Sequence, residues 1–143
     1  MKKKQVSRIN PSELFDSVSS GFTQVIVEED ENIKTVYVSG QTAWNSDRKM
    51  IGVGDLFVQV VESLRNLEKA LKAVDLTLTD VHSMRIYIKE SYIKDTAAVT
   101  RGLKEVFGTN LPCSTWVGVP ALAVEDFLVE IEPSPINIFK SKS

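Results

Sequence analysis

Two short stretches near the start of the chain are rich in β-branched residues and enclose a polar gap. Residues 22–28 and 35–41 carry valine, isoleucine and threonine at high density, and residues 29–32 between them are acidic or polar. β-branched side chains favour extended backbone, and a short polar gap is typical of a turn between two strands. The pattern predicts a β-hairpin.

A longer stretch after this hairpin repeats its apolar residues at intervals of three and four. The preceding segment, AWNSDRKMIGVGD, is polar and glycine-rich, which indicates a loop ending at Asp55. The apolar positions that follow are Leu56, Phe57, Val60, Val61, Leu64, Leu67, Leu71 and Val74. Because this spacing places them on one helical face, we predict an amphipathic helix capped by Asp55.

The next two elements show first a period of two and then a helical period. Residues 81–89 alternate, which predicts a strand with Met84, Ile86 and Ile88 on one face and a wetter opposite face. A second helix is expected from about residue 91 to Gly108, a stop signal. Its apolar stripe comprises Tyr92, Thr96, Val99, Leu103 and Val106.

Two final strands are predicted at residues 114–119 and 127–131, joined by a loop at 120–126. The order is strand, strand, helix, strand, helix, strand, strand, in which each helix can cross over between strands. This predicts an α+β protein with a mixed sheet and both helices on one face. Apolar groups lie on both sides of the last strand, so we expect the uncovered face to bind a partner subunit. These groups are Phe127, Leu128, Val129 and Ile131.

Composition fits one globular domain spanning residues 1–143, with 43% hydrophobic and 25% charged residues. The net charge of −2 and pI near 5.5 argue against a nucleic-acid partner, because the only basic clusters lie at the two ends of the chain. One cysteine cannot form an internal disulfide, and no apolar run approaches the length of a membrane span. We expect a cytoplasmic protein with no membrane partner.

No metal site or cofactor is expected. One cysteine and one histidine cannot assemble a zinc-type cluster. The GVGD segment at 52–55 lacks the spacing of a phosphate-binding loop and is better interpreted as a flexible loop ending in a helix cap. We place His82 in a satisfied core or edge position, and Cys113 as a small packed hydrophobe. A nucleophilic role for Cys113 is disfavoured, because alternation turns it away from its neighbour Ser114.

Two segments carry a family resemblance: VYVSGQ at 36–41 and LPCSTWVGVPALAVEDFLVEIE at 111–132. Together they resemble the reactive intermediate deaminase (RidA) family, also called YjgF-like or L-PSP proteins, over a core of about residues 22–132. The resemblance implies a chorismate-mutase-like fold with a mixed six-stranded sheet and two helices on one face. It also implies a homotrimer whose sheets form a central barrel, with small-molecule pockets between neighbouring subunits.

Residue by residue, the resemblance carries over part of a pocket. Glu130 matches the family's pocket glutamate, which is thought to position water, and Ser39 and Gly40 match the Ser-Gly pair after the second strand. Four further positions depart from the usual residues. Ser114 replaces the arginine, Phe22 a frequent tyrosine, Thr100 a frequent asparagine and Trp116 a small residue.

The missing arginine changes the expected chemistry. Deaminating members of the family bind the carboxylate of a 2-imino acid with this arginine and hydrolyse the imine to a keto acid and ammonia. A serine offers neither the charge nor the bidentate donors, so we expect the pKa of Glu130 to exceed that of an arginine-paired carboxyl. Because Phe22 and Trp116 are aromatic, any imine substrate is expected to lack a carboxylate and to have an apolar or aromatic body.

Two alternatives stay open at this point. In the first, Trp116 fills the pocket, and the protein is a non-catalytic or regulatory trimer that binds a small molecule. In the second, which the acidic composition disfavours, the protein cleaves RNA or inhibits translation, as some family members do. Arg85, Lys89 and Arg101 are candidates for a replacement cation, but a solvated surface position is favoured for all three.

Overall fold

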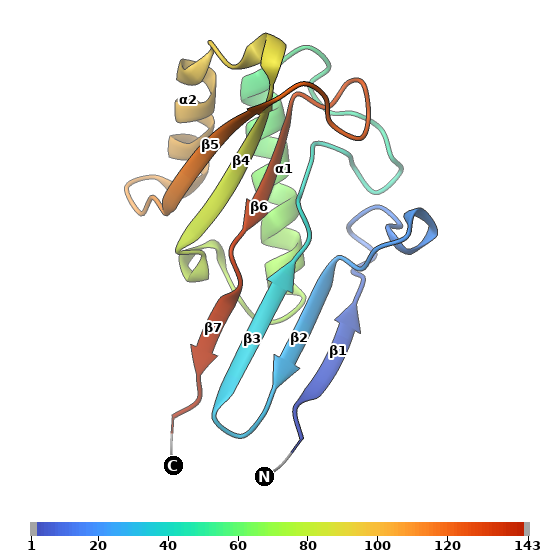
Figure 1. Ribbon diagram of the computed structural model, residues 1–143, viewed down its shortest axis with the longest axis vertical. Coiled ribbons are helices and arrows are strands. Elements are labelled where there is room, and N and C mark those ends of the chain that lie inside the picture. Colours follow the sequence, from blue (N-terminus) through green and yellow to red (C-terminus); the bar gives the residue numbers. More distant parts are fainter. Residues whose placement is uncertain (1–2, 142–143) are drawn as a thin grey trace.

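The computed structural model describes residues 3–141 and shows an α+β protein (Figure 1). Two long helices and seven strands make up the described part of the chain. They follow in the order β1 (Gln5–Ile9), β2 (Val25–Glu29), β3 (Ile33–Val38), α1 (Leu56–Lys72), β4 (Ser83–Lys89), α2 (Thr96–Phe107), β5 (Cys113–Val119), β6 (Val129–Pro133) and β7 (Ile136–Phe139). The predicted α+β class is confirmed.

The strands form two hydrogen-bonded groups that meet beside β6. One group has the antiparallel order β1-β2-β3-β7, and it contains the predicted hairpin as β2 and β3. The other has the order β5-β4-β6, with β4 parallel to β5 and antiparallel to β6. Gln41 and Ile131 connect them, because each backbone N–H donates to the other's carbonyl, at 2.8 and 2.9 Å. In Figure 1, β6 leads directly toward β7 of the other group.

The described residues form seven strands, whereas the sequence pattern predicts five and the family resemblance implies six. The two strands that the pattern does not predict are β1 and β7, which lie at the two edges of the four-stranded group. The residues of β1 are almost all exposed, and only one of the four residues of β7 is buried. A strand with so little buried surface shows no apolar alternation, so the sequence pattern could not reveal it.

Both helices cover one face of the sheets, as predicted (Figure 1). The side chain of Asp55 accepts a hydrogen bond from the backbone N–H of Val58 at 3.0 Å, which confirms the predicted N-cap of α1. Helix α2 begins at Thr96 and not near residue 91, because Glu90–Tyr92 forms a 3-10 turn and Asp95 caps the helix. The two helices approach closely at Gly102, where an added Cβ would lie 2.5 Å from Cγ1 of Val60.

In β6 the residues that face away from the helices are polar, which corrects the expectation of apolar groups on both sides of the last strand. Phe127 and Leu128 precede β6 and are buried within the chain. In β6 itself, buried apolar residues alternate with Glu130 and Glu132. Glu132 lies 3.7 Å from the Arg85 guanidinium. The last strand therefore gives no apolar argument for a partner subunit, and the homotrimer implied by the family resemblance stays a prediction.

Among residues 3–141, no helix is long and apolar enough to cross a membrane. Within the same range, no group of three or more histidine, cysteine, aspartate or glutamate side chains could hold a metal ion.

Candidate functional site

A cavity of about 390 Å³ lies beside Glu130, where the two strand groups meet. Three segments far apart in the sequence line it: the loop before β2, the segment that follows β3, and the chain entering β6. Serine, threonine and glutamate side chains supply its polar lining, and four aromatic rings supply much of the apolar lining. Glu130 is the only ionisable residue among those that line it.

Two buried amide side chains of α1 hold the cavity walls in place. Nδ2 of Asn66 donates to the carbonyl oxygens of Thr42 and Trp44, each at 2.8 Å. Gln59 donates to the carbonyl of Asp126 at 3.0 Å and accepts from the N–H of Leu128 at 2.9 Å. These backbone groups belong to loops, and side chains of α1 supply their hydrogen-bond partners. Helix α1 therefore fixes the loops that form the cavity, although no residue of α1 lines the cavity itself.

The segment after β3 is fixed in a similar way. Nε2 of Gln41 donates to Oε1 of Gln24 at 2.9 Å and to the carbonyl of Ser39 at 3.0 Å. The Ser39 hydroxyl donates to the carbonyl of Thr23 at 2.6 Å. Because its proton is engaged there, Ser39 can offer a ligand only an acceptor oxygen.

Glu130 is half-buried and faces the cavity without a compensating cation. Among the described residues, no ion pair or side-chain hydrogen bond reaches its carboxylate. Burial raises the pKa of Glu130 above its ordinary value, and the negative charge of Glu132 raises it further. A carboxyl group with a raised pKa in a cavity is a candidate acid or base.

Four aromatic side chains form a continuous series around the cavity. Phe15 contacts Phe22 and Trp44, with ring centroids 5.9 and 5.1 Å apart, and Trp44 contacts Phe127 at 5.1 Å. All three contacts are edge-to-face, the geometry that the ring quadrupoles favour. Of these four residues, only Phe22 was predicted from the sequence to lie in the pocket. A tryptophan within a polar, glycine-rich loop was the signal that could have pointed to Trp44.

Arg48 braces this aromatic series from the loop after β3. Its guanidinium carbon lies 5.8 Å from the ring centroids of both Phe15 and Trp44. Nη2 of Arg48 donates to the carbonyl of Asp16 at 2.6 Å and lies 2.7 and 3.1 Å from the hydroxyls of Ser19 and Ser20. Arg48 adopts a φ of 59°, which non-glycine residues seldom adopt. The sequence analysis missed this cation, because the contact depends on the fold of two separate loops.

Comparison with known proteins gives this arrangement a family. A model of the family described as Endoribonuclease L-PSP matches residues 17–134, most of the chain. The protein belongs to the endoribonuclease L-PSP family. Its matched range encloses the expected core of about residues 22–132.

Individual relatives of this L-PSP chain agree with that assignment. The RutC family protein UK114 of Drosophila melanogaster is 32% identical over 111 residues, which cover 78% of this chain and 75% of that protein. A 2-iminobutanoate/2-iminopropanoate deaminase of Dermatophagoides farinae is 29% identical over 98 residues, or 68% of this chain and 74% of the relative. A crystal structure of YyfA, a Rid family protein of unknown function from Yersinia pestis, covers 94% of this chain and 100% of its own, with 25% identity and a TM-score of 0.77.

The pocket residues inferred from the L-PSP resemblance fall into two groups. Phe22, Ser39, Gly40 and Glu130 come together around the cavity. The two motifs, at residues 39–41 and 130–132, are far apart in the sequence. They meet because Gln41 and Ile131 form an antiparallel β-bridge. Ser114, Trp116 and Thr100 do not line this cavity.

Strand register explains why Ser114 and Glu130 are apart. Ser114 pairs with the buried Met84 on the helix side of β4, whereas Glu130 pairs with Tyr87 on the opposite side. The two residues are separated by β4 and offset by three register positions. At about 3.3 Å per residue and about 4.8 Å per strand, that is roughly 10 Å in each direction. One chain therefore does not bring these two side chains into one pocket.

On the helix side of β5, Ser114 and Trp116 form their own unit. Nε1 of the Trp116 indole donates to Oγ of Ser114 at 2.9 Å. Ser114 is exposed and Trp116 is half-buried against the core. Thr100 is half-buried on α2.

The other candidate residues form no ion pair with Glu130 in the described part of the chain. Lys89 lies 3.4 Å from the Glu125 carboxylate, and the guanidinium of Arg101 lies 4.9 Å from the ring centroid of Phe57. Cys113 is exposed and not packed, and it lies on the opposite face of β5 from Ser114. His82 is exposed just before β4 and therefore does not lie in the core.

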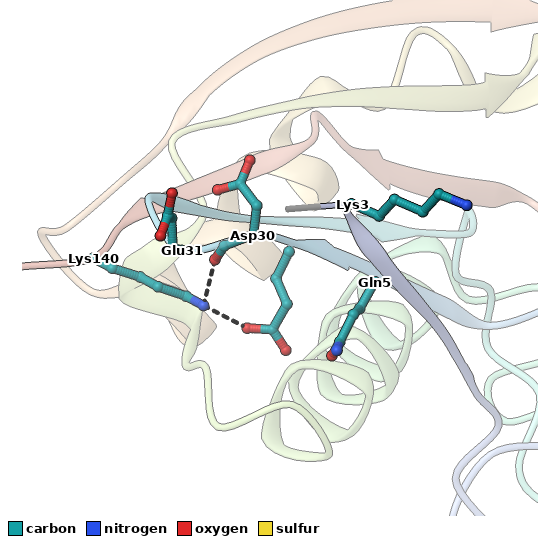
Figure 2. A pocket seen from close by; sticks show the side chains of 6 residues that line it. Lys3, Gln5, Asp30, Glu31 and Lys140 are labelled. Carbon is teal, nitrogen blue, oxygen red and sulfur yellow. Dashed lines mark hydrogen bonds and ion pairs between the residues drawn. The ribbon is translucent and has the colours of Figure 1, made fainter. Parts of the chain in front are cut away.

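A larger hollow, of about 590 Å³, lies at the tip of the β2–β3 hairpin (Figure 2). Nζ of Lys140 lies 2.9 Å from Oε2 of Glu29 and donates to the carbonyl of Asp30 at 2.6 Å. The Lys140 hydrogen bond lowers the pKa of Glu29, and backbone N–H groups of Asn32 and Ile33 lower that of Asp30. These exposed carboxylates are already stabilised as anions. Glu130 is therefore the better candidate for a reactive carboxyl group, because its pKa is raised and not lowered.

Proposed function

We propose that this protein binds a small molecule in the Glu130 cavity and hydrolyses an enamine or imine there. In that reaction water adds to the C=N carbon, the carbon–nitrogen bond breaks, and a carbonyl compound and ammonia leave. The observation that carries the proposal is Glu130 itself, half-buried in an aromatic cavity with a raised pKa and no paired cation. The name of the Dermatophagoides relative supports the reaction class.

Glu130 is suited to two proton transfers in this reaction. As a carboxylate it can take a proton from the attacking water, and as a carboxylic acid it can supply one to the departing nitrogen. Burial and the charge of Glu132 both raise the pKa of Glu130, so its carboxyl holds a proton more readily than an ordinary glutamate and is better suited to supply one. The fixed loops around the cavity would hold the substrate against this group, which supplies the orientation that water addition needs.

The proposal includes a homotrimer whose neighbouring subunits complete the site. Glu130 and the aromatic series form one half of the cleft, and Ser114 with Trp116 forms the other half on an accessible edge strand. This part of the proposal follows the expectation, from the family resemblance, of pockets between subunits, and the separation of the two halves within one chain supports it. Light scattering should give the mass of three 15.9 kDa chains.

Ammonia release from imines generated in solution tests the catalytic proposal. Glu130→Gln should abolish release, whereas Glu132→Gln should retain it. Glu132 is a matched control because it lies two residues along β6 and outside the cavity, paired with Arg85. Equal activity of the Glu130→Gln variant would refute the role of Glu130.

A non-catalytic binding protein is the second candidate. The aromatic cavity favours it, since four rings can bind an apolar ligand with no reaction. Ligand-dependent thermal shifts with no ammonia release from any imine would support this candidate over the first.

A further inference from the structure

The ionic character of the Glu130 cavity identifies the kind of ligand that it can bind. Among the cavity-lining residues the only charged group is the Glu130 carboxylate, and a second carboxylate, Glu132, lies two residues further along β6. No cation of the described chain pairs with it. A ligand carboxylate placed beside Glu130 would meet like charge in a desolvated site, which is costly.

The aromatic series specifies the rest of the ligand. Phe15, Phe22, Trp44 and Phe127 all line the cavity, and each contacts another ring of the series edge-to-face. A planar apolar body can pack against these rings, and aromatic faces also attract a cation. The volume of about 390 Å³ is within the range of small-molecule sites.

We propose that this cavity binds an aryl-substituted nitrogen base without a carboxylate, either an arylalkylammonium ion or the corresponding iminium. The N–H groups of the ligand donate to the Glu130 carboxylate, and the aryl body packs against the aromatic series. The proposal rests on the proposed function in that it names the ligand class of the same cavity. It concerns recognition, so binding can be tested without turnover.

Arg48 offers an alternative to this mode of binding, in which a ligand carboxylate pairs with its guanidinium. Its guanidinium lies over Phe15 and Trp44 and donates toward the Ser20 hydroxyl, and all three of these residues line the cavity. A carboxylate at the rim could pair with this arginine. However, three acceptors already engage Nη2, which favours a bracing role for Arg48.

Isothermal titration calorimetry with three ligands of similar shape separates these possibilities. We would titrate the full chain with 2-phenylethylamine, 2-phenylethanol and 3-phenylpropanoate, which present a cation, a neutral hydroxyl and an anion on the same aryl body. The amine should bind about tenfold more tightly than the alcohol, since a charge-assisted hydrogen bond is worth about that factor. The carboxylate should bind weakest. Propylamine, which lacks the ring, should bind more weakly than 2-phenylethylamine.

Three variants test which residues cause the preference for the aryl amine. Glu130→Gln should reduce the affinity for the amine to that for the alcohol, and Glu132→Gln should not. Phe22→Leu should weaken all three aryl ligands, and the partly exposed position of Phe22 makes the change safe for folding. The propylamine comparison tests the aryl contribution on the unaltered protein and so does not depend on any variant.

Several results would overturn the proposal. These are no binding of 2-phenylethylamine, amine affinity unchanged in Glu130→Gln, or equal binding of propylamine. Tighter binding of 3-phenylpropanoate, lost in Arg48→Met, would instead assign the cavity to anions held by Arg48. Amine binding without imine hydrolysis would support the proposed ligand class and refute the catalytic proposal. Hydrolysis only of imines that carry a carboxylate would support the catalytic proposal and refute the proposed ligand class.

Discussion

The α-carbon of Gly40 lies against the carboxylate of Glu130, and a Cβ built on Gly40 would collide with Oε2 and lie 3.0 Å from Cδ and Cγ of Glu130. Gly40 follows β3, and Glu130 lies in β6. The two meet because Gln41 and Ile131 exchange backbone hydrogen bonds. The Ser-Gly pair and Glu130, the first glutamate of the Glu-Ile-Glu run that closes the family signature, are thus parts of one contact. Gly40 sets the position that the Glu130 carboxylate takes.

Gly40→Ala should therefore displace the carboxylate without unfolding the protein. The backbone at Gly40 does not require glycine, and the clashing atoms belong to a flexible side chain that can move. We expect a small change in Tm and a loss of ammonia release of roughly 10- to 100-fold, since small displacements of reacting groups cost about that much. Full activity with an unchanged Tm would show that the position of this carboxylate is unimportant.

The raised pKa of Glu130 predicts a pH-dependent stability difference. The folded protein holds the Glu130 proton more tightly than the unfolded chain, so this group lowers stability as pH rises from its ordinary pKa of 4.5 to the raised folded value. The loss is complete above the folded pKa. Glu130→Gln removes this charge and should be more stable than the parent at neutral pH, with the difference disappearing below pH 4.5.

Urea unfolding at several pH values and one fixed protein concentration measures this difference. A gap between variant and parent that stays constant across the pH range would show that the effect does not come from titration of Glu130.

Asn66→Ala should weaken both the fold and the cavity. The change leaves the carbonyls of Thr42 and Trp44 without their shared donor, and an unpaired buried group costs about 1–3 kcal/mol. The loop carrying Trp44 would loosen, so ligand affinity should also fall. Ser63→Ala is the matched control: Ser63 is buried on the same helix, and its hydroxyl has no hydrogen-bond partner. Equal destabilisation by both changes, measured by urea unfolding, would contradict this role of Asn66.

Ser114→Arg should create or raise activity on ordinary 2-imino acids, because it restores the donor fork that grips a carboxylate. Ser114 is exposed, so an arginine fits without disturbing the core. Cys113→Arg adds the same charge one position away on the opposite face of β5 and should have no such effect. The rate of ammonia release from a 2-imino acid is measured for the parent and for both variants. No gain in a stable, trimeric Ser114→Arg variant would contradict the idea that the missing arginine excludes these substrates.

The periodicity of apolar residues predicted those helices and strands that bury one face. The apolar spacing of α1, the hairpin of β2 and β3, and the wetter face of β4 follow directly from patterns of three, four and two. It failed for β1 and β7, whose edge positions bury too little surface to impose a pattern.

The candidate site divides in the same way. Glu130, Gly40 and Ser39 were predicted because they lie in the two sequence motifs that carry the family resemblance. Trp44 and Arg48 were not, because their loop has no period. Its conformation depends on Asn66, 22 residues away from Trp44 in sequence, and on contacts with the segment before β2. Such contacts become visible only in three dimensions.

The central claim is that Glu130 and the aromatic series select an aryl nitrogen compound without a carboxylate. The most direct measurement compares ammonia release from two imines that differ only in that group, generated by oxidases from 2-phenylethylamine and from phenylalanine. We predict faster catalysed release from the imine of 2-phenylethylamine, lost in Glu130→Gln. Faster release from the imine of phenylalanine would contradict the account.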